Sequence, residues 1–273
     1  MNYYIYNPYA NNGKINHKLN KFDQKLLIAT TEEKKIKALK RKLKTDDIIY
    51  FIGGDGTLCY ILNNFSFLAS YEIRYVGIGT ANDFNKSLVK NNVYYYTINN
   101  EYHFINGFGI GFDALVCYNT NRLVNKTKLS YYKQCFLSLK AYEPLTIDMT
   151  CDGKDYHYEK VWLCSLQNGQ YFGGGIKIAK DADISAEKID LIVGHNCNIF
   201  KVIILLLFIK LGLGHWFKKT LVTSKIDTIK IYNKTKLLTQ FDGDNIFIDG
   251  NIELTGKTLV KIKKYSLEEL LNS

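Results

Sequence analysis

The sequence predicts an N-terminal α/β domain with a parallel sheet, followed by a second domain that is an antiparallel β-sandwich. Up to about residue 90, short apolar runs alternate with segments in which apolar residues recur at helical spacing. From about residue 93, short β-like segments separated by Gly and Asn turns dominate. A chain of 273 residues is long enough to bury a sizeable core in one or two domains.

The first elements predict a strand, a loop, a second strand and a helix. Residues 2–8 form a strand that ends at Asn7, and residues 28–31 form a second short strand. Thr31 is placed to cap a helix that has acidic residues in its first turn and basic residues near its end. The buried stripe of this helix is Ile36, Leu39 and Leu43.

Residues 48–57 are the stretch around which the chain is organised. The apolar run at 48–52 predicts a buried strand, which Gly-Gly-Asp-Gly-Thr ends abruptly at 53–57 before helical spacing begins at Leu58. Glycine lets the backbone approach a ligand closely, and N–H groups at a helix start favour phosphate. Asp55 beside phosphate indicates Mg²⁺ or a water on Mg²⁺. The alternative is a tight turn whose glycines serve geometry alone.

A second stretch of the same kind favours the ligand-binding interpretation. Residues 75–79 predict another short strand, which is followed by Thr-Ala-Asn-Asp-Phe at 80–84. Two strands that each end in Gly, Thr and Asp place both turns at one carboxyl edge of the sheet. Open α/β sheets bind their ligands at that edge.

The second half predicts a β-rich domain interrupted by helices. Residues 93–98 and 102–105 read as a hairpin around an Asn-Asn-Glu turn. Helices are expected near 126–141 and 199–218, with a closing helix at 266–271. Further strands are expected at 145–150, 156–167, 189–195, 226–232, 236–241, 246–248 and 259–264.

Residues 199–217 permit two interpretations. The apolar run at 202–208 is far too short to span a bilayer, which takes roughly 20 residues. Lys, Trp and Phe at its ends suit a helix that lies in a membrane interface, with membrane contact through Leu205, Phe208, Trp216 and Phe217. The alternative is a helix packed against the second domain.

Composition narrows the class of protein. Six cysteines without CxxC spacing indicate reduced thiols in a cytosolic protein and argue against zinc or a disulfide framework. The N-terminus enters a strand directly, so we expect no signal peptide. The net charge of +10 suits nucleic acid, an anionic membrane or a phosphate-rich substrate, and no nucleic-acid motif is present.

The two motifs, GGDGT at 53–57 and GTANDF at 79–84, resemble the diacylglycerol-kinase catalytic domain of soluble bacterial lipid kinases. The resemblance covers almost the whole chain, including the Gly-rich segments 106–113 and 171–179. It implies that ATP and Mg²⁺ are bound and that residues 265–273 return to the first domain (1–92), leaving 93–264 as a lipid-substrate domain. The implied nucleotide-binding residues are Asn7, Thr31, Gly53, Gly54, Asp55, Gly56, Thr57, Gly79, Thr80, Asn82 and Asp83.

The resemblance also implies a catalytic carboxylate, with departures at several carboxylate positions. The family's Asp-Gly-Glu base falls on residues 242–244, so that Asp244, one methylene shorter, is the expected base. An Asp of the family's metal network falls on Ala186, with Glu187 or Asp183 as a substitute; the expected metal ligands are Asp55 and Glu187. Two further expected carboxylates fall on Tyr60 and Tyr95.

The resemblance implies an ATP-dependent kinase that phosphorylates a hydroxyl of diacylglycerol or a related membrane lipid. Such a protein is expected in the cytoplasm, peripheral at the inner face of an anionic membrane and without nucleic acid, and a homodimer is a possible assembly. One alternative is a weak or inactive relative that binds nucleotide or lipid at the membrane. An NAD-kinase-like activity is a further alternative, against which the GTANDF motif and the apolar run speak.

Overall fold

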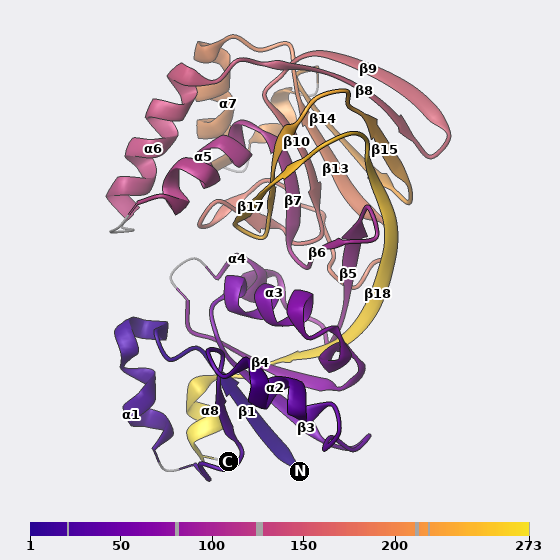
Figure 1. Ribbon diagram of the computed structural model, residues 1–273. Coiled ribbons are helices and arrows are strands. Elements are labelled where there is room, and N and C mark those ends of the chain that lie inside the picture. The colour runs from indigo at the N-terminus through magenta and orange to yellow at the C-terminus, as the bar shows by residue number, and fades with distance from the viewer. Residues whose placement is uncertain (21, 80–81, 124–127, 211–212, 218, 273) are drawn as a thin grey trace.

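The computed structural model describes residues 1–20, 22–79, 82–123, 128–210, 213–217 and 219–272. These residues form two lobes, with the α/β lobe at the bottom of Figure 1 and the β-rich lobe above it. Both labelled termini lie in the lower lobe. The predicted fold class, an α/β domain followed by an antiparallel β-sandwich, is confirmed.

The lower lobe is built on parallel strands in the order β2–β1–β3–β4. Strand β3 is apolar throughout because both of its faces are covered. Its Ile49 and Phe51 pack on one side of the sheet, and its Tyr50 and Ile52 pack on the other. The bounds are β1 Asn2–Tyr6, β2 Leu27–Ala29, β3 Ile48–Gly53 and β4 Glu72–Gly77.

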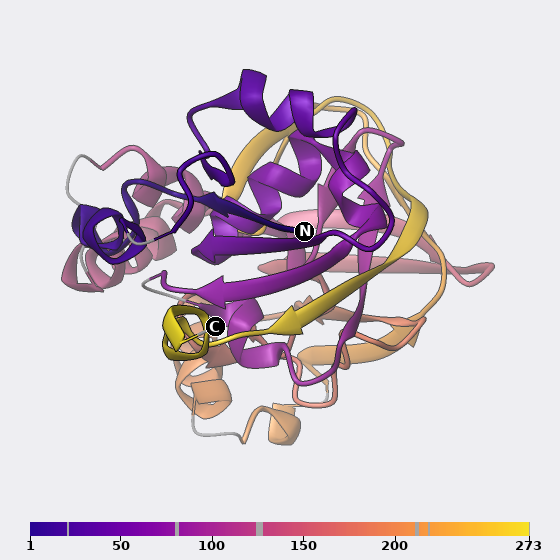
Figure 2. The same ribbon diagram turned by 90° about the horizontal axis from the view of Figure 1, so that it is seen from below.

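Helices cover both faces of this sheet (Figure 2). Ile36 of α2 and Leu58 of α3 pack on one face, whereas Leu19 of α1 and Leu270 of α8 pack on the other. The C-terminal helix therefore contacts the first lobe. The bounds are α1 Ile15–Leu19, α2 Glu33–Leu39, α3 Asp55–Asn64, α4 Asp83–Ser87 and α8 Leu267–Asn272, with short 3₁₀ turns at Ala10–Gly13 (η1) and Ser66–Ser70 (η2).

The start of α2 corrects one expectation. The residue that caps α2 is Glu32, so Thr31 lies outside the helix and does not cap it. The Glu32 carboxylate accepts a hydrogen bond from the Ala29 N–H at 3.1 Å, and its carbonyl accepts from Lys35 and Ile36. These bonds fix the chain one residue later than the sequence pattern indicates.

Strand β18, Ile252–Lys264, joins the two lobes without a loop. Its first residues pair with β15, its middle pairs antiparallel with β5, and its last residues, 262–264, run parallel to β4. The sequence predicts only residues 259–264 of this strand. The polar and Gly-containing stretch at 252–258 conceals its beginning.

The upper lobe packs two antiparallel sheets around one apolar core. One sheet contains β9–β8–β15–β18 with β5 and β6, and the other has the order β14–β13–β10–β7–β16–β17. The bounds are β5 Asn92–Ile98, β6 Tyr102–Phe104, β7 Gly107–Gly111, β8 Leu145–Cys151, β9 Lys154–Val161, β10 Leu163–Gln167, β11 Tyr171–Phe172, β12 Ile176–Lys177, β13 Ile189–Gly194, β14 Leu221–Ile226, β15 Ile229–Tyr232, β16 Leu237–Phe241 and β17 Asp244–Ile248.

Two predicted strands are each broken into two. The run at 156–167 is interrupted at Trp162, between the end of β9 at Val161 and the start of β10 at Leu163, and Lys160 near the end of β9 has a φ of 51°. The run at 226–232 turns at 227–228, where the backbone N–H groups donate to the Asp152 carboxylate. In both places a turn lies inside an otherwise apolar or β-branched pattern.

Three helices cover the outer face of the second sheet (Figure 1): α5 Phe112–Asn121, α6 Lys128–Ala141 and α7 Ile199–Lys210. The predicted helices near 126–141 and 199–218 correspond to α6 and to α7 followed by the 3₁₀ turn η3, Gly214–Phe217. Helix α5 is not predicted from the sequence, and the Gly-containing residues 107–111 that precede it form the buried strand β7.

The orientation of α7 corrects one membrane-contact expectation. Leu205 is 6% exposed and packs in the core with Val202 and Ile209, so it is not available to a membrane. Phe208 is partly buried against the rings of Trp216 and Phe217. Within the described ranges, the helices are all too short or too polar to cross a bilayer.

Candidate functional site

The two glycine-rich turns lie side by side at the carboxyl ends of β3 and β4. Gly53 is opposite Gly77 in the strand register, and the Ile78 N–H donates to the Gly53 carbonyl at 2.8 Å. A Cβ on Gly79 would lie 2.7 Å from the Cα of Gly54, so the close approach requires glycine. The expectation that both turns meet at one sheet edge is confirmed.

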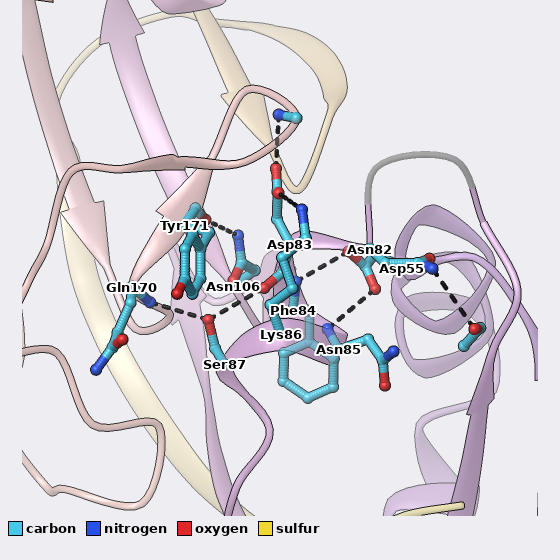
Figure 3. A network of polar contacts seen from close by, with 12 residues as sticks. Asp55, Asn82, Asp83, Phe84, Asn85, Lys86, Ser87, Asn106, Gln170 and Tyr171 are labelled. Carbon is cyan, nitrogen blue, oxygen red and sulfur yellow. Dashed lines mark hydrogen bonds and ion pairs between the residues drawn. The ribbon is translucent and has the colours of Figure 1, made fainter. Parts of the chain in front are cut away.

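Asp55 ties the first turn to the second (Figure 3). Its carboxylate accepts hydrogen bonds from the Phe84 N–H at 2.9 Å and from the Asn85 N–H at 3.3 Å. It also accepts one from the Tyr75 hydroxyl at 2.8 Å. Burial raises the pKa of Asp55, as does the neighbouring Asp83, against the lowering effect of these bonds. The negative charge lies at the N-terminal end of α4, where backbone N–H groups stabilise it.

Helix α4 connects this edge to the upper lobe. The Asp83 carboxylate accepts a hydrogen bond from the Gly174 N–H at 2.8 Å and contacts the Lys86 ammonium at 3.3 Å (Figure 3). The Ser87 hydroxyl accepts from the Gln170 N–H at 3.0 Å. The Gly-rich loop at 173–175, one of the segments noted in the sequence, is therefore fixed against the second turn.

A pocket of about 500 Å³ opens beside the first turn, and we call it the GGDGT pocket. The Asn7 amide donates to the Thr57 hydroxyl at 3.0 Å, which joins the loop after β1 to the start of α3. The Thr57 N–H donates to the Gly54 carbonyl at 3.0 Å, and N–H groups at a helix start such as this suit an anionic ligand. The lining residues are Asn7, Thr30, Thr31, Glu33, Gly56, Thr57 and Tyr60.

Tyr60 and Glu33 form one wall of this pocket. The Tyr60 hydroxyl donates to Glu33 Oε1 at 2.5 Å, while Glu33 Oε2 lies 3.7 Å from the Lys37 ammonium. The hydrogen bond to Glu33, with a smaller contribution from burial, raises the pKa of Tyr60. A carboxylate therefore faces the pocket next to Tyr60, but it comes from α2 rather than from α3.

The turn between β16 and β17 is fixed from several directions. The Asp242 carboxylate accepts three backbone hydrogen bonds of 2.7–2.9 Å from Ile105, Asn106 and Gly107. The carbonyl of Gly243 accepts from the Asn121 amide at 2.7 Å. Asp244, the next residue, is exposed and opens β17. An anchored turn thus presents the carboxylate of Asp244 at the surface.

This turn lies against α3, the helix that begins in the GGDGT turn. Burial raises the pKa of the Cys59 thiol well above its usual range, and the charges of Asp242 and Asp244 raise it further. Cys59 lies on the second turn of α3. The turn at 242–244 therefore lies near α3, with Asp242 beside Cys59.

Family models match the chain in both lobes. The model described as "Diacylglycerol kinase catalytic domain" matches residues 2–100. The model described as "YegS C-terminal NAD kinase beta sandwich-like domain" matches residues 107–252, which is more than half of the chain. The chain belongs to the diacylglycerol kinase catalytic-domain family. The resemblance inferred from GGDGT and GTANDF is confirmed.

Individual relatives agree with this assignment. The chain is 23% identical over 256 residues to "Putative lipid kinase YtlR" of Bacillus subtilis, covering 80% of this chain and 77% of that protein. A solved diacylglycerol kinase structure from Bacillus anthracis is 22% identical, covers 96% of this chain and 94% of the other, and has a TM-score of 0.70. A further structure from that organism has a TM-score of 0.69 at 21% identity, with 93% and 94% covered. At these identities the structures establish the fold.

A kinase of this family implies a nucleotide and a divalent metal, and Mg²⁺ requires oxygen ligands such as carboxylates. Within the described ranges, no three His, Cys, Asp or Glu side chains are grouped as metal ligands. Asp55 already accepts three hydrogen bonds. Glu187 lies elsewhere, 3.8 Å from the Lys257 ammonium, and its carbonyl accepts from the Tyr96 hydroxyl. These side chains do not fit a site in which the protein alone ligates Mg²⁺.

The positions that depart from the family pattern have local roles. Asp183, considered as a substitute for the missing Asp at 186, closes a turn and pairs with Lys90 at 2.6 Å. Burial alone would raise the pKa of Asp183, but hydrogen bonds from Lys90 and Ser185 lower it to about 2. Tyr95 is buried in the core of the lower lobe, where its ring faces His103.

The structure gathers most of the predicted nucleotide-binding residues at one edge of the sheet. Asn82 opens α4 in a left-handed conformation with a φ of 51°. Thr80 lies outside the described residues. The residues that this edge brings together are Asn7, Thr31, Gly53, Gly54, Asp55, Gly56, Thr57, Gly79, Asn82 and Asp83.

Several residues of this site were not predicted from the sequence. Tyr75 holds Asp55, but in the sequence it is one more apolar residue of a strand. In the sequence, Glu33 is one of the acidic residues in the first turn of a predicted helix. Nothing in that pattern indicates that it lines a pocket. Asn121 belongs to the unpredicted helix α5. Long-range contacts of this kind leave no local pattern.

Proposed function

We propose that the protein is an ATP-dependent lipid kinase, which transfers the γ-phosphate of ATP to a hydroxyl of diacylglycerol or a related membrane lipid. The observation that supports this most is the anchored turn at 242–244, which carries Asp244 and lies near Cys59 of α3, the helix that begins in the GGDGT turn. A phosphate cradle and a carboxylate for the acceptor hydroxyl are the parts that phosphoryl transfer needs.

In this proposal the triphosphate lies on the N–H groups at the start of α3, beside the bonded pair Asn7 and Thr57. The substrate is MgATP, so the ion arrives with the phosphates rather than in a cage of protein ligands. The lipid oxygen attacks the γ-phosphorus, the bond to the β–γ bridging oxygen breaks, and Asp244 accepts the hydroxyl proton. ADP and a phosphorylated lipid are the products.

The acceptor places the protein at a membrane. Diacylglycerol is held in a bilayer, so we propose a peripheral location at the cytoplasmic face, where anionic lipid attracts a chain of net charge +10. The test is transfer of radiolabel from ATP, with Mg²⁺, into a total lipid extract presented as mixed micelles. Asp244→Asn is the informative variant, and Asp249→Asn, an exposed carboxylate in the next turn, is the matched control.

We expect a labelled lipid with the wild type and with Asp249→Asn. With Asp244→Asn we expect the rate to fall by at least about 100-fold, while the affinity for ATP, measured by calorimetry, changes little. Full activity of Asp244→Asn would remove that residue from the base role.

A second candidate is a relative that binds nucleotide or lipid but transfers phosphate weakly. The observation that favours it is that Ala186, Tyr60 and Tyr95 stand where the family carries carboxylates. Tyr95 is buried in the core, and the carboxylate beside Tyr60 comes from Glu33 of α2. ATP binding without any labelled lipid would favour this second function. In that case Ala186→Asp is the next variant to assay.

A further inference from the structure

Helix α7 is apolar on both its inner and its outer side. Its inner face is buried: Val202, Leu205 and Ile209 are 4–6% exposed. Four large apolar side chains at helical spacing face solvent, and we call them the outer stripe: Phe200 (71% exposed), Ile203 (45%), Ile204 (46%) and Leu207 (55%). A helix that is apolar all round normally has both faces covered, so the outer stripe indicates a partner.

The 3₁₀ turn η3 extends this stripe. Phe208 of α7 contacts the rings of Trp216 and Phe217, with centroid distances of 5.9 and 5.2 Å. The ring of Trp216 thus lies against α7 while the residue remains 68% exposed. Trp is the side chain that prefers the boundary between hydrocarbon and lipid headgroups.

The charges around the outer stripe identify the kind of partner. Lys201 and Lys219 are exposed at the two ends of the α7–η3 segment. Between Asp190 and Asp227 the sequence contains no Asp or Glu, but it has lysines at 201, 210, 218, 219 and 225. This pattern suits an anionic lipid surface, since lysine bordering an apolar helix face attracts the headgroups. A second copy of the chain would bring these lysines against one another.

We propose that α7 and η3 form a docking surface that lies flat on an anionic bilayer, with the outer stripe and Trp216 inserted among the lipids. This inference rests on the proposed function, because a kinase that phosphorylates a membrane lipid has to reach its substrate in a bilayer. The 12 residues of α7 span about 18 Å, so the helix lies in the interface and does not cross it.

The docking surface is one hairpin away from the candidate site. Helix α7 contacts β12, and β12 pairs with β11. The loop of this hairpin contains Gly174, whose N–H donates to Asp83 at the start of α4. A bilayer seated on α7 would therefore lie next to a segment that is bonded directly to the GTANDF turn.

The test is flotation with phosphatidylcholine vesicles, prepared with and without phosphatidylglycerol. The variant Ile203→Gln/Leu207→Gln removes half of the outer stripe without touching the buried face. Its matched control is Leu259→Gln, which removes a side chain that is 51% exposed on β18. We expect binding to the anionic vesicles to fall by about tenfold or more in the stripe variant and to stay within about twofold in the control.

A charge variant provides an independent measurement. We expect Lys201→Glu/Lys219→Glu to lose the preference for phosphatidylglycerol vesicles and most of its salt dependence. The control is Lys230→Glu on β15. Unchanged vesicle binding in both the stripe and the charge variants, with melting temperatures that show folded protein, would overturn the proposal. A dimer that the stripe variant converts to a monomer would also overturn it, by making the stripe a contact between copies.

Activity in mixed micelles separates this inference from the proposed function. The stripe variant should phosphorylate lipid in micelles at the wild-type rate and fail on vesicles. If the wild type phosphorylates no lipid in either form but its vesicle binding depends on the stripe, the docking surface stands and the kinase function fails. If the wild type phosphorylates lipid in micelles and the stripe variant binds vesicles as well as the wild type does, only the docking surface fails.

Discussion

Gly54 and Gly79 belong to different motifs, yet a Cβ on Gly79 would lie 2.7 Å from the Cα of Gly54. The contact is between two backbones, which cannot swing aside as a side chain would. The two phosphate-type turns are therefore a single packed unit.

Gly79→Ala should lower the free energy of unfolding by about 1–3 kcal/mol, because the added methyl group forces the two turns apart. The matched control is Gly56→Ala, where a Cβ would meet no atom within 4 Å and alanine favours the helix. Urea titration of both variants measures the difference. Equal stability of the two variants would contradict the packing described here.

Asp242→Asn should also destabilise the fold, by about 1–3 kcal/mol, because an amide oxygen cannot replace both carboxylate oxygens that accept from Ile105, Asn106 and Gly107. Asp152→Asn is the control, since that turn also reads Asp-Gly but its bonds to 227–228 use Oδ1 alone. Thermal unfolding should separate the two. A loss as large in Asp152→Asn would show that the Asp-Gly turn, rather than the buried anchor, is responsible.

Tyr60→Phe should weaken ATP binding through Glu33. Without the hydroxyl, the Glu33 carboxylate loses its 2.5 Å bond and turns its charge toward the GGDGT pocket. A charge about 4 Å from phosphate costs about 1 kcal/mol in water, or about fivefold in affinity. Calorimetry at two salt concentrations measures this. The double variant Tyr60→Phe/Glu33→Gln should bind as the wild type does, and a double variant as weak as Tyr60→Phe would rule out the charge effect.

Asp113 should make stability depend on pH. Burial raises the pKa of Asp113 from 3.8 to about 7, although Gln240 donates a hydrogen bond to it at 3.2 Å. The folded protein then binds more protons than the unfolded chain between these values, so Asp113 stabilises the fold fully below pH 4 and this contribution is lost as the pH rises through 7. Nearby Tyr142 and Cys164 have raised pKa values and stay neutral in this range.

The measurement is the difference in unfolding free energy between the wild type and Asp113→Asn at pH 4 and pH 8. We expect the wild type to lose up to about 4 kcal/mol relative to the variant over this interval. Parallel pH profiles for the two proteins would show that Asp113 does not titrate in this range.

The strands of the lower lobe and their turns could be predicted from the sequence because each has a local cause. Strand β3 is a continuous apolar run between turn residues, and its glycines mark where it ends. The hairpin of β5 and β6 follows from Asn99 and Asn100, both of which adopt the positive φ values that such a turn requires. These patterns involve neighbours in sequence.

What the sequence could not predict depends on contacts far along the chain. An all-apolar segment such as 199–210 has no periodic contrast, so it does not reveal that Leu205 faces the core while Leu207 faces solvent. The hydrogen bonds from Tyr75 to Asp55 and from Asn121 to Gly243 join residues that are far apart in the sequence. No local sequence pattern predicts such pairs. Most of strand β18 could not be predicted from the sequence, because most of its residues lie at the surface and most of those on the exposed face are polar.

Strand β18 also has a consequence for biosynthesis. The ribosome completes β4 long before it reaches residues 262–264, which later pair with Ile73–Tyr75. Until then the nascent lower lobe carries an open strand edge, although its own helices can already form. Such an edge invites pairing with other chains and is a surface that chaperones protect. The first lobe to leave the ribosome is therefore completed only by the last strand that the structure describes.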